Sequence, residues 1–229
     1  MKTVGIIGGL GPETTSEFYL ELIFSSFDRN KIQRSPILIW NVPIECKIEE
    51  ELITAAKGEE RYLPYLIDAA QRLEKGGVDF IVMPCNSMHI FIDDIRSKVN
   101  IPVLSILEET AKFLKSRDIF EVGIVATTST ISKKLYEKHL NQVGIKQISP
   151  DDFQQAKIGK IINNLVLSRH NNTDRQELIK IIDSFSNKNI RTLILACTDL
   201  QLLIPHHESM KIYDTMKILV NATVQELLK

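Results

Sequence analysis

The chain has 229 residues, enough for one large domain or two smaller lobes, and its 44% hydrophobic and 25% charged residues are typical of a globular protein. The net charge of −1 leaves no basic excess for a nucleic-acid backbone, and no apolar run reaches the roughly 18 residues of a membrane span. With three cysteines and no signal-peptide pattern, we expect a cytoplasmic protein without disulfides that binds neither nucleic acid nor membranes.

Short apolar runs alternate with longer amphipathic stretches along the chain. The runs that predict strands are, in chain order, Lys2–Ile7, Ile37–Val42, Phe80–Met83, Pro102–Ile106, Val122–Ala126, Thr192–Ala196 and Ile212–Tyr213. The stretches that predict helices are Pro12–Phe27, Arg61–Lys75, Ser87–Lys98, Glu108–Lys115, Ser132–Gln142, Ala156–Leu167, Arg175–Ser184, Leu200–Ile204 and Met216–Leu228. This alternation predicts an α/β fold with parallel sheets flanked by helices.

A weak internal repeat suggests two similar lobes. The run Val4–Ile7 recurs as Val122–Val125, and Phe80–Cys85 recurs in the same order as Leu193–Cys197. We expect a first lobe of residues 1–101 plus 211–229, which carries Cys85, and a second lobe of residues 102–210, which carries Cys197. Ligands of open α/β sheets bind at the carboxyl ends of the strands. Two lobes that face each other would therefore place these cysteines across one cleft.

Cys85 and Cys197 have similar surroundings in the sequence. Each ends a predicted strand and precedes small polar residues and a predicted helix, with Asn86 and Ser87 in the first lobe and Thr198 in the second. Backbone N–H groups at a helix start favour a thiolate or a carboxylate. A buried cysteine is often only a small apolar residue, but two at equivalent positions of a repeat favour a functional pair.

Two thiols that face each other suit stereoinversion at an acidic carbon. One thiol removes a proton from one face of the carbon, and the other delivers a proton to the opposite face. The geometry requires neither a metal nor an organic cofactor. Carboxylate-binding donors in a dry cleft would then have to stabilise the developing charge.

Two strand-to-helix turns are further candidates for the walls of the cleft. The segment Gly8–Thr14 lacks the third glycine of a dinucleotide fingerprint and the Lys-Ser/Thr pair of a P-loop. We interpret it as a tight turn whose backbone amides line the cleft. The segment Ala126–Ile131 occupies the matching place in the second lobe, where its hydroxyls would hold a carboxylate or cap the following helix.

The remaining cysteine and the histidines suggest less specific interpretations. Cys46 lacks the context of the other two cysteines, and we expect it to be inert. A zinc site could combine Cys85 and His89 with His206–His207, but no Cys-x-x-Cys pair is present. His89 is equally well interpreted as a satisfied helix residue, so no metal is expected. The acidic run Glu49–Glu51 is expected to be a solvated face.

Several segments resemble the aspartate/glutamate racemase family of cofactor-independent enzymes. Met1–Glu13 is similar to the family's opening, and Met83–His89 is similar to its first cysteine motif, usually Pro-Cys-Asn-Thr-x-His. Ala196–Asp199 is similar to its second motif, usually Gly-Cys-Thr-Glu, and Val125–Thr130 and the helix at Ala156–Leu167 also match in order. The resemblance spans nearly the whole chain.

This resemblance implies two pseudo-symmetric Rossmann-like lobes with the active site in the cleft between them. It implies an amino-acid substrate, no cofactor, a homodimer, and Cys85 and Cys197 as catalytic acid and base. The substrate-binding residues that it implies are Leu10, Asn86, Ser87, Thr127 and Thr198.

Three departures from the family pattern leave the substrate open. The loop after the second strand lacks the arginine usual in aspartate-specific members, so Lys47 is the candidate cation. Asp199 replaces the usual Glu, and Leu167–Arg169 stands where some members carry a lysine. We expect an aspartate or glutamate racemase. The alternatives are a broad-specificity amino-acid racemase, an isomerase or decarboxylase of a small dicarboxylic acid, and a non-enzymatic carboxylate- or zinc-binding protein.

Overall fold

The structure is a computed structural model that describes residues 1–45, 47–48, 58–203, 207 and 209–229. The described chain divides into two compact units: unit 1 is Met1–Glu109 with Met216–Lys229, and unit 2 is Thr110–Thr215. The sequence prediction set these boundaries at 101/102 and 210/211. In the structure they fall within helix α5 (Ile106–Lys115) and after the first residue of helix α10 (Thr215–Leu227).

Within the described ranges, none of the helices has the length and apolar character needed to cross a membrane.

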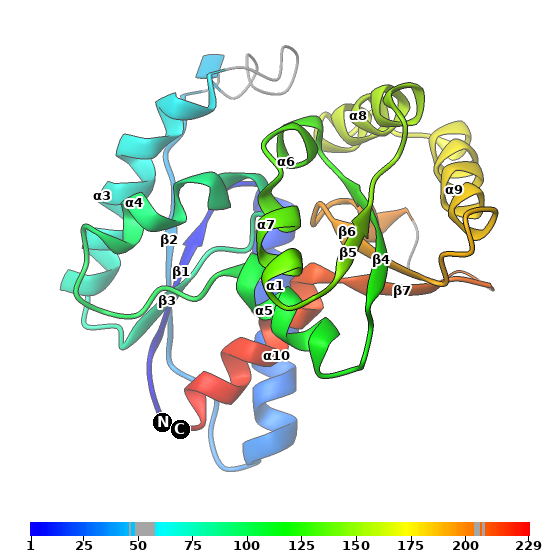
Figure 1. The fold of residues 1–229 in the computed structure, drawn as a ribbon. Helices are drawn as coiled ribbons and strands as arrows, with labels where there is room; N and C mark the ends of the chain where they lie inside the picture. The colour runs from blue at the N-terminus through cyan, green and yellow to red at the C-terminus, as the bar shows by residue number, and fades with distance from the viewer. Residues whose placement is uncertain (46, 49–57, 204–206, 208) are drawn as a thin grey trace. The chain divides into compact units, whose positions relative to one another are not determined.

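Unit 1 contains a parallel sheet with β1 (Val4–Gly8) at its centre. β2 (Ile37–Asn41) and β3 (Phe80–Val82) pair with β1 on either side (Figure 1). The other helices of unit 1 are α1 (Pro12–Asn30), α3 (Leu63–Lys75) and α4 (Ile92–Arg96), with 3₁₀ turns at Glu59–Tyr62 and Ser87–Phe91. Every residue of β1 is buried, as expected for a strand of a parallel sheet covered by helices.

Unit 2 contains a parallel sheet of four strands in the order β5-β4-β6-β7 (Figure 1). These strands are β4 (Glu121–Ala126), β5 (Lys146–Ile148), β6 (Thr192–Ala196) and β7 (Lys211–Asp214). The helices are α6 (Thr128–Ser132), α7 (Leu135–Gln142), α8 (Asp152–Val166) and α9 (Asn172–Ser186), with a 3₁₀ turn at Leu200–Leu202. The predicted fold class, with two parallel sheets flanked by helices, is confirmed.

The two sheets share one strand order. In unit 1 the order is β2-β1-β3, and Val103 forms a parallel bridge to Ile81 on the free side of β3. Val103 thus occupies the position that β7 has in unit 2. The repeat seen in the sequence therefore corresponds to two units of the same topology.

Helix faces with apolar residues at i, i+3, i+4 and i+7 complete both cores. In unit 1, α3 buries Leu66, Ala69, Ala70 and Leu73 and packs on β1 and β2. In unit 2, α8 buries Ile158, Ile161, Ile162 and Leu165, and α9 buries Leu178, Ile181, Ile182 and Phe185. Each large aliphatic side chain of this kind stabilises the fold by about 1.5–3 kcal/mol relative to an exposed one.

Two of the predicted elements need correction, and one strand was not predicted. The strand expected at Pro102–Ile106 is only the bridge at Val103, because Glu109 N–H bonds to Ser105 O and the chain enters α5 there. The helix expected at Ser132–Gln142 is broken, because Lys134 adopts the left-handed conformation with φ of 54° between α6 and α7. Strand β5 was missed, since its polar, half-exposed residues at the sheet edge give no apolar run.

The turn from β1 into α1 is built on Thr15. Its Oγ1 accepts a hydrogen bond from Gly9 N–H at 2.9 Å and donates one to Gly11 O at 3.0 Å. A Cβ at Gly8 would lie 2.5 Å from Thr15 Cγ2, so only glycine allows this close approach. Pro12 begins α1 where its missing N–H costs no helical hydrogen bond.

Gly9→Ala tests this turn. Gly9 has φ of 81°, and its added Cβ would lie 2.7 Å from Asn41 Oδ1 and 3.0 Å from Val42 N, a backbone atom that cannot move without shifting the end of β2. Gly144→Ala is the matched control, since Gly144 has φ of 79° and no atom within 4 Å of the added Cβ. We expect a loss of about 1–2 kcal/mol in unfolding free energy for the control and a further loss of about 1–3 kcal/mol for Gly9→Ala, measured by urea unfolding. Equal losses would contradict the steric argument.

Candidate functional site

Each unit places one cysteine at the carboxyl edge of its sheet. In unit 1, β3 pairs with the central strand β1, and Cys85 follows β3 after two residues. In unit 2, β6 pairs with β4, and Cys197 directly follows β6. In each unit the cysteine therefore lies on the edge where the turn after the central strand also lies. That edge is where open α/β sheets bind ligands.

Cys85 is half-buried and packs against the apolar core of unit 1. Its N–H donates to Met83 O at 2.9 Å, which closes a tight turn after β3. Its Sγ lies 3.7 Å from Ser87 Oγ, and either atom can be the donor. The neighbouring Asn86 is buried. Cys85, Asn86 and Ser87, predicted as site residues, thus form one group.

Cys197 is more deeply buried and has a carboxylate as its neighbour. Its side chain belongs to the core of unit 2, and Thr198 beside it is buried as well. Cys197 Sγ donates to Asp199 Oδ2 at 3.5 Å. One thiol therefore contacts a hydroxyl and the other a carboxylate, so the two are not chemically equivalent.

The helix starts expected after the cysteines are short 3₁₀ turns. Five residues, Ser87–Phe91, form the turn after Cys85, and three residues, Leu200–Leu202, form the turn after Cys197. The turn after Cys85 continues directly into α4, which begins at Ile92. Stabilisation of each thiolate by the N–H groups that follow it stays a prediction.

The other predicted binding residues, Thr127, Leu10 and Lys47, differ in burial and in their contacts. Thr127 is the N-cap of α6: its Oγ1 accepts from Thr130 N–H at 3.1 Å and donates to Thr130 Oγ1 at 2.9 Å. Leu10 is partly buried and packs on the core of unit 1. Lys47 is exposed in the segment after β2.

Cys46, Glu49–Glu51, His206 and the end of the predicted Leu200–Ile204 helix lie outside the described residues.

His89 is fully buried and makes hydrogen bonds with both ring nitrogens. Nδ1 lies 2.7 Å from Cys85 O, and Nε2 lies 3.1 Å from Ile106 N. A backbone carbonyl can only accept and a backbone N–H can only donate, so the imidazole is neutral with its proton on Nδ1. Burial lowers the pKa of His89 from 6.5 to about 4. The sequence considered His89 as a zinc ligand or a satisfied helix residue, and the structure shows the latter.

Two supporting residues were not predicted. Gln155 of α8 is buried and donates from Nε2 to Ala126 O at 3.1 Å, which holds the end of β4. Thr215 is fully buried and donates to Leu195 O at 2.9 Å, which holds the end of β6. A polar residue on the apolar face of the α8 pattern is the signal that could have identified Gln155.

The described residues contain no group of three or more His, Cys, Asp or Glu side chains placed to bind a metal ion.

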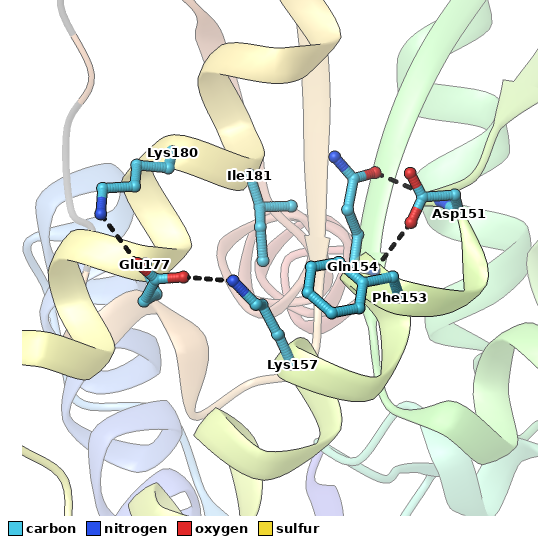
Figure 2. Close-up of a pocket in the computed structure, with 7 residues that line it drawn as sticks. All are labelled: Asp151, Phe153, Gln154, Lys157, Glu177, Lys180 and Ile181. Carbon is cyan, nitrogen blue, oxygen red and sulfur yellow. Dashed lines mark hydrogen bonds and ion pairs between the residues drawn. The ribbon is translucent and has the colours of Figure 1, made fainter.

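A cavity of about 380 Å³ lies elsewhere, between α8 and α9 (Figure 2). Figure 2 shows Lys157 and Lys180 both directed at Glu177, with Nζ–Oε distances of 2.6 and 2.8 Å. These lysines lower the pKa of Glu177 to about 2, chiefly through the hydrogen bond from Lys157. None of the predicted site residues lines this cavity, in which Lys157 and Lys180 pair with Glu177 and Asp151 caps α8.

A family model described as Asp/Glu/hydantoin racemase matches residues 7–223. The chain belongs to this family. Membership confirms the enzyme class predicted from the cysteine motifs, an amino-acid racemase.

Individual relatives agree with this placement. The chain is 28% identical to the broad specificity amino-acid racemase RacX of Bacillus subtilis, over 98% of both chains. It is 27% identical to a glutamate racemase of Hydrogenobaculum over 80% of this chain and 69% of that protein. Among solved structures, an aspartate racemase homologue from Pyrococcus horikoshii matches all of both chains with a TM-score of 0.81 and 26% identity.

His89 should make stability depend on pH. Because its pKa is about 4 in the folded protein and close to the ordinary 6.5 once the chain unfolds, the unfolded chain binds the proton more readily, and stability is lost as pH falls through this interval. The difference between the two pKa values corresponds to about 3 kcal/mol of unfolding free energy. Between about pH 7.5 and pH 4, both the wild type and His89→Asn should lose unfolding free energy. We expect the loss to be about 3 kcal/mol larger in the wild type. Parallel urea-unfolding curves at each pH would measure it, and equal falls would contradict the buried neutral imidazole.

Proposed function

We propose that the protein is a cofactor-independent amino-acid racemase that inverts Cα with Cys85 and Cys197 as its two acid/base groups. The observation that carries this proposal is the equivalent position of the two thiols, each at the carboxyl edge of a parallel sheet of the same strand order. The proposal includes a cleft in which the two edges meet one substrate. The similarity to RacX over nearly the whole chain supports racemisation.

The proposed reaction transfers one proton in each half-step. One cysteine, as thiolate, takes the Cα proton, so that the C–H bond breaks, an S–H bond forms and the electron pair passes into the substrate carboxylate. The other cysteine, as thiol, gives its proton to the opposite face, so that a C–H bond forms and a thiolate remains. In the reverse reaction the two cysteines exchange roles: the one that donated the proton now removes it, and the other donates.

Donors near the cysteines would bind the substrate carboxylate and stabilise its developing charge. In unit 1 these are Asn86 and Ser87, and in unit 2 they are Thr198 and Thr127, although the Thr127 hydroxyl also caps α6. Hydrogen bonds in a site that excludes water are worth more than in solution. The buried state of Asn86 and Thr198 fits this requirement.

Aspartate or glutamate is the first candidate substrate, as the family resemblance implies. A broad side-chain range is the second candidate, for two reasons. The RacX relative is a broad specificity enzyme, and the usual loop arginine is absent, with Lys47 the candidate cation in its place. The homodimer implied by the resemblance is part of the proposal.

A panel of L- and D-amino acids tests the proposed activity. Without added cofactor, the protein should remove the optical rotation of at least one amino acid. Cys85→Ser and Cys197→Ser should each lower kcat by roughly a thousandfold or more, because a serine hydroxyl is a far weaker acid than a thiol. Maleate and substituted malonates belong in the panel as substrates of the isomerase and decarboxylase alternatives.

Cys46→Ser is the control and should keep full activity. Full activity in both Cys85→Ser and Cys197→Ser would reject the mechanism. Tight binding of an amino acid without turnover would favour the carboxylate-binding alternative.

Asp199 offers a second test, because its carboxylate accepts the hydrogen bond of the Cys197 thiol. Asp199→Asn should lower kcat/KM roughly 10- to 100-fold, equally in both directions, since the amide no longer provides the charge that orients the thiol proton. Asp199→Glu should recover part of the loss, and Asp152→Asn, an exposed carboxylate in the first turn of α8, should have no effect. Racemisation measured by chiral chromatography would decide, and wild-type rates in Asp199→Asn would exclude the role.

A further inference from the structure

His89 lies between the Cys85 loop and the start of α5. Cys85 leaves the end of β3 through a tight turn, which its N–H closes by bonding Met83 O. His89 comes from the 3₁₀ turn Ser87–Phe91, and its ring reaches that carbonyl with a short Nδ1–O distance of 2.7 Å. The same ring reaches forward to the first residue of α5, where Ile106 N–H lies 3.1 Å from Nε2.

The bond from Ile106 N–H to His89 Nε2 gives an acceptor to a backbone donor at the start of α5. The first N–H groups of a helix have no partner within the helix, and at the start of α5 the Ile106 N–H is buried. The imidazole supplies the missing acceptor. The ring therefore joins two backbone segments that leave the carboxyl edge of the unit 1 sheet, one after β3 and one after the Val103 bridge.

The surroundings keep this ring neutral. His89 is 2% exposed, and the titratable groups that act on it are Arg96 of α4 and Glu108 of α5. These two form an ion pair, with Arg96 Nη1 2.7 Å from Glu108 Oε1. Arg96 lowers and Glu108 raises the pKa of the ring, and burial, which lowers it, is the largest of the effects.

We propose that His89 is the positioning residue for Cys85, its neutral ring fixing the backbone from which the thiol projects by bonding Cys85 O and Ile106 N–H together. His89 touches no substrate in this role. The inference deepens the proposed function and rests on it for its consequence in catalysis. A displacement of a catalytic group by about 1 Å can lower a rate on the order of a hundredfold.

The test compares His89→Phe, which keeps a similar volume and removes both hydrogen bonds, with His89→Asn, whose side-chain amide keeps a donor near the place of Nδ1. His170→Phe, at an exposed position, is the control. Iodoacetamide labelling followed by peptide mass spectrometry reports the alkylation rates of Cys85 and Cys197 separately, without reference to activity.

For His89→Phe we expect a Cys85 alkylation rate altered by about threefold or more, with the Cys197 rate unchanged. We expect kcat to fall by roughly tenfold or more with KM changed by less than about threefold, and His89→Asn to lie between His89→Phe and the wild type. The imidazole ¹⁵N shifts of the wild type should show the Nδ1–H tautomer, neutral at about pH 6.

The proposal would be overturned if the folded variants kept wild-type behaviour. That outcome is a kcat, and alkylation rates of both cysteines, within about twofold of the wild-type values. Equal changes at Cys85 and Cys197 would overturn it too, because they would show general loosening. An Nε2–H tautomer in the wild type would overturn it without any variant. If no amino acid is racemised but the Cys85 rate alone responds to His89→Phe, the proposed function fails and the positioning of Cys85 stands.

Discussion

Parallel strand pairing is the constraint on which the structure depends. Because β1 and β3 run in the same direction, as do β4 and β6, the chain leaves each pair of strands at one edge of the sheet. Cys85 and the Gly8–Gly11 turn therefore share one edge in unit 1, and Cys197 and Thr127 share one edge in unit 2. The repeated topology places one thiol at this edge in each unit, and the proposed two-base inversion would use both.

Buried polar groups hold the backbone at the carboxyl edge of each sheet. In unit 1 the His89 ring bonds the Cys85 carbonyl, whereas in unit 2 Gln155 and Thr215 bond the carbonyls of Ala126 and Leu195. A buried polar group that lost its partner would cost about 1–3 kcal/mol. These bonds therefore stabilise the two edges of the sheets. The different neighbours of the thiols, a hydroxyl and a carboxylate, distinguish two otherwise equivalent positions.

The sequence predicted the fold class, the repeat and the strand-end position of both cysteines, because apolar periodicity reports burial and burial determines which runs become strands. It failed where local geometry overrides periodicity. The left-handed Lys134 splits a helix, the edge strand β5 carries no apolar run, and a 3₁₀ turn replaces the first half of the helix predicted after Cys85. Hydrogen-bond partners such as His89 with Ile106 lie far apart in the sequence, so spacing alone does not reveal them.

The central claim is that two thiols act on opposite faces of one Cα. The most direct measurement is the fate of solvent deuterium in the first turnovers of a single enantiomer. The account predicts that the inverted product carries deuterium at Cα while the remaining substrate keeps its protium, because the group that donates the new proton is not the group that removed the old one. Product that retains the original protium, or early deuterium in substrate and product alike, would show a single base and contradict the account.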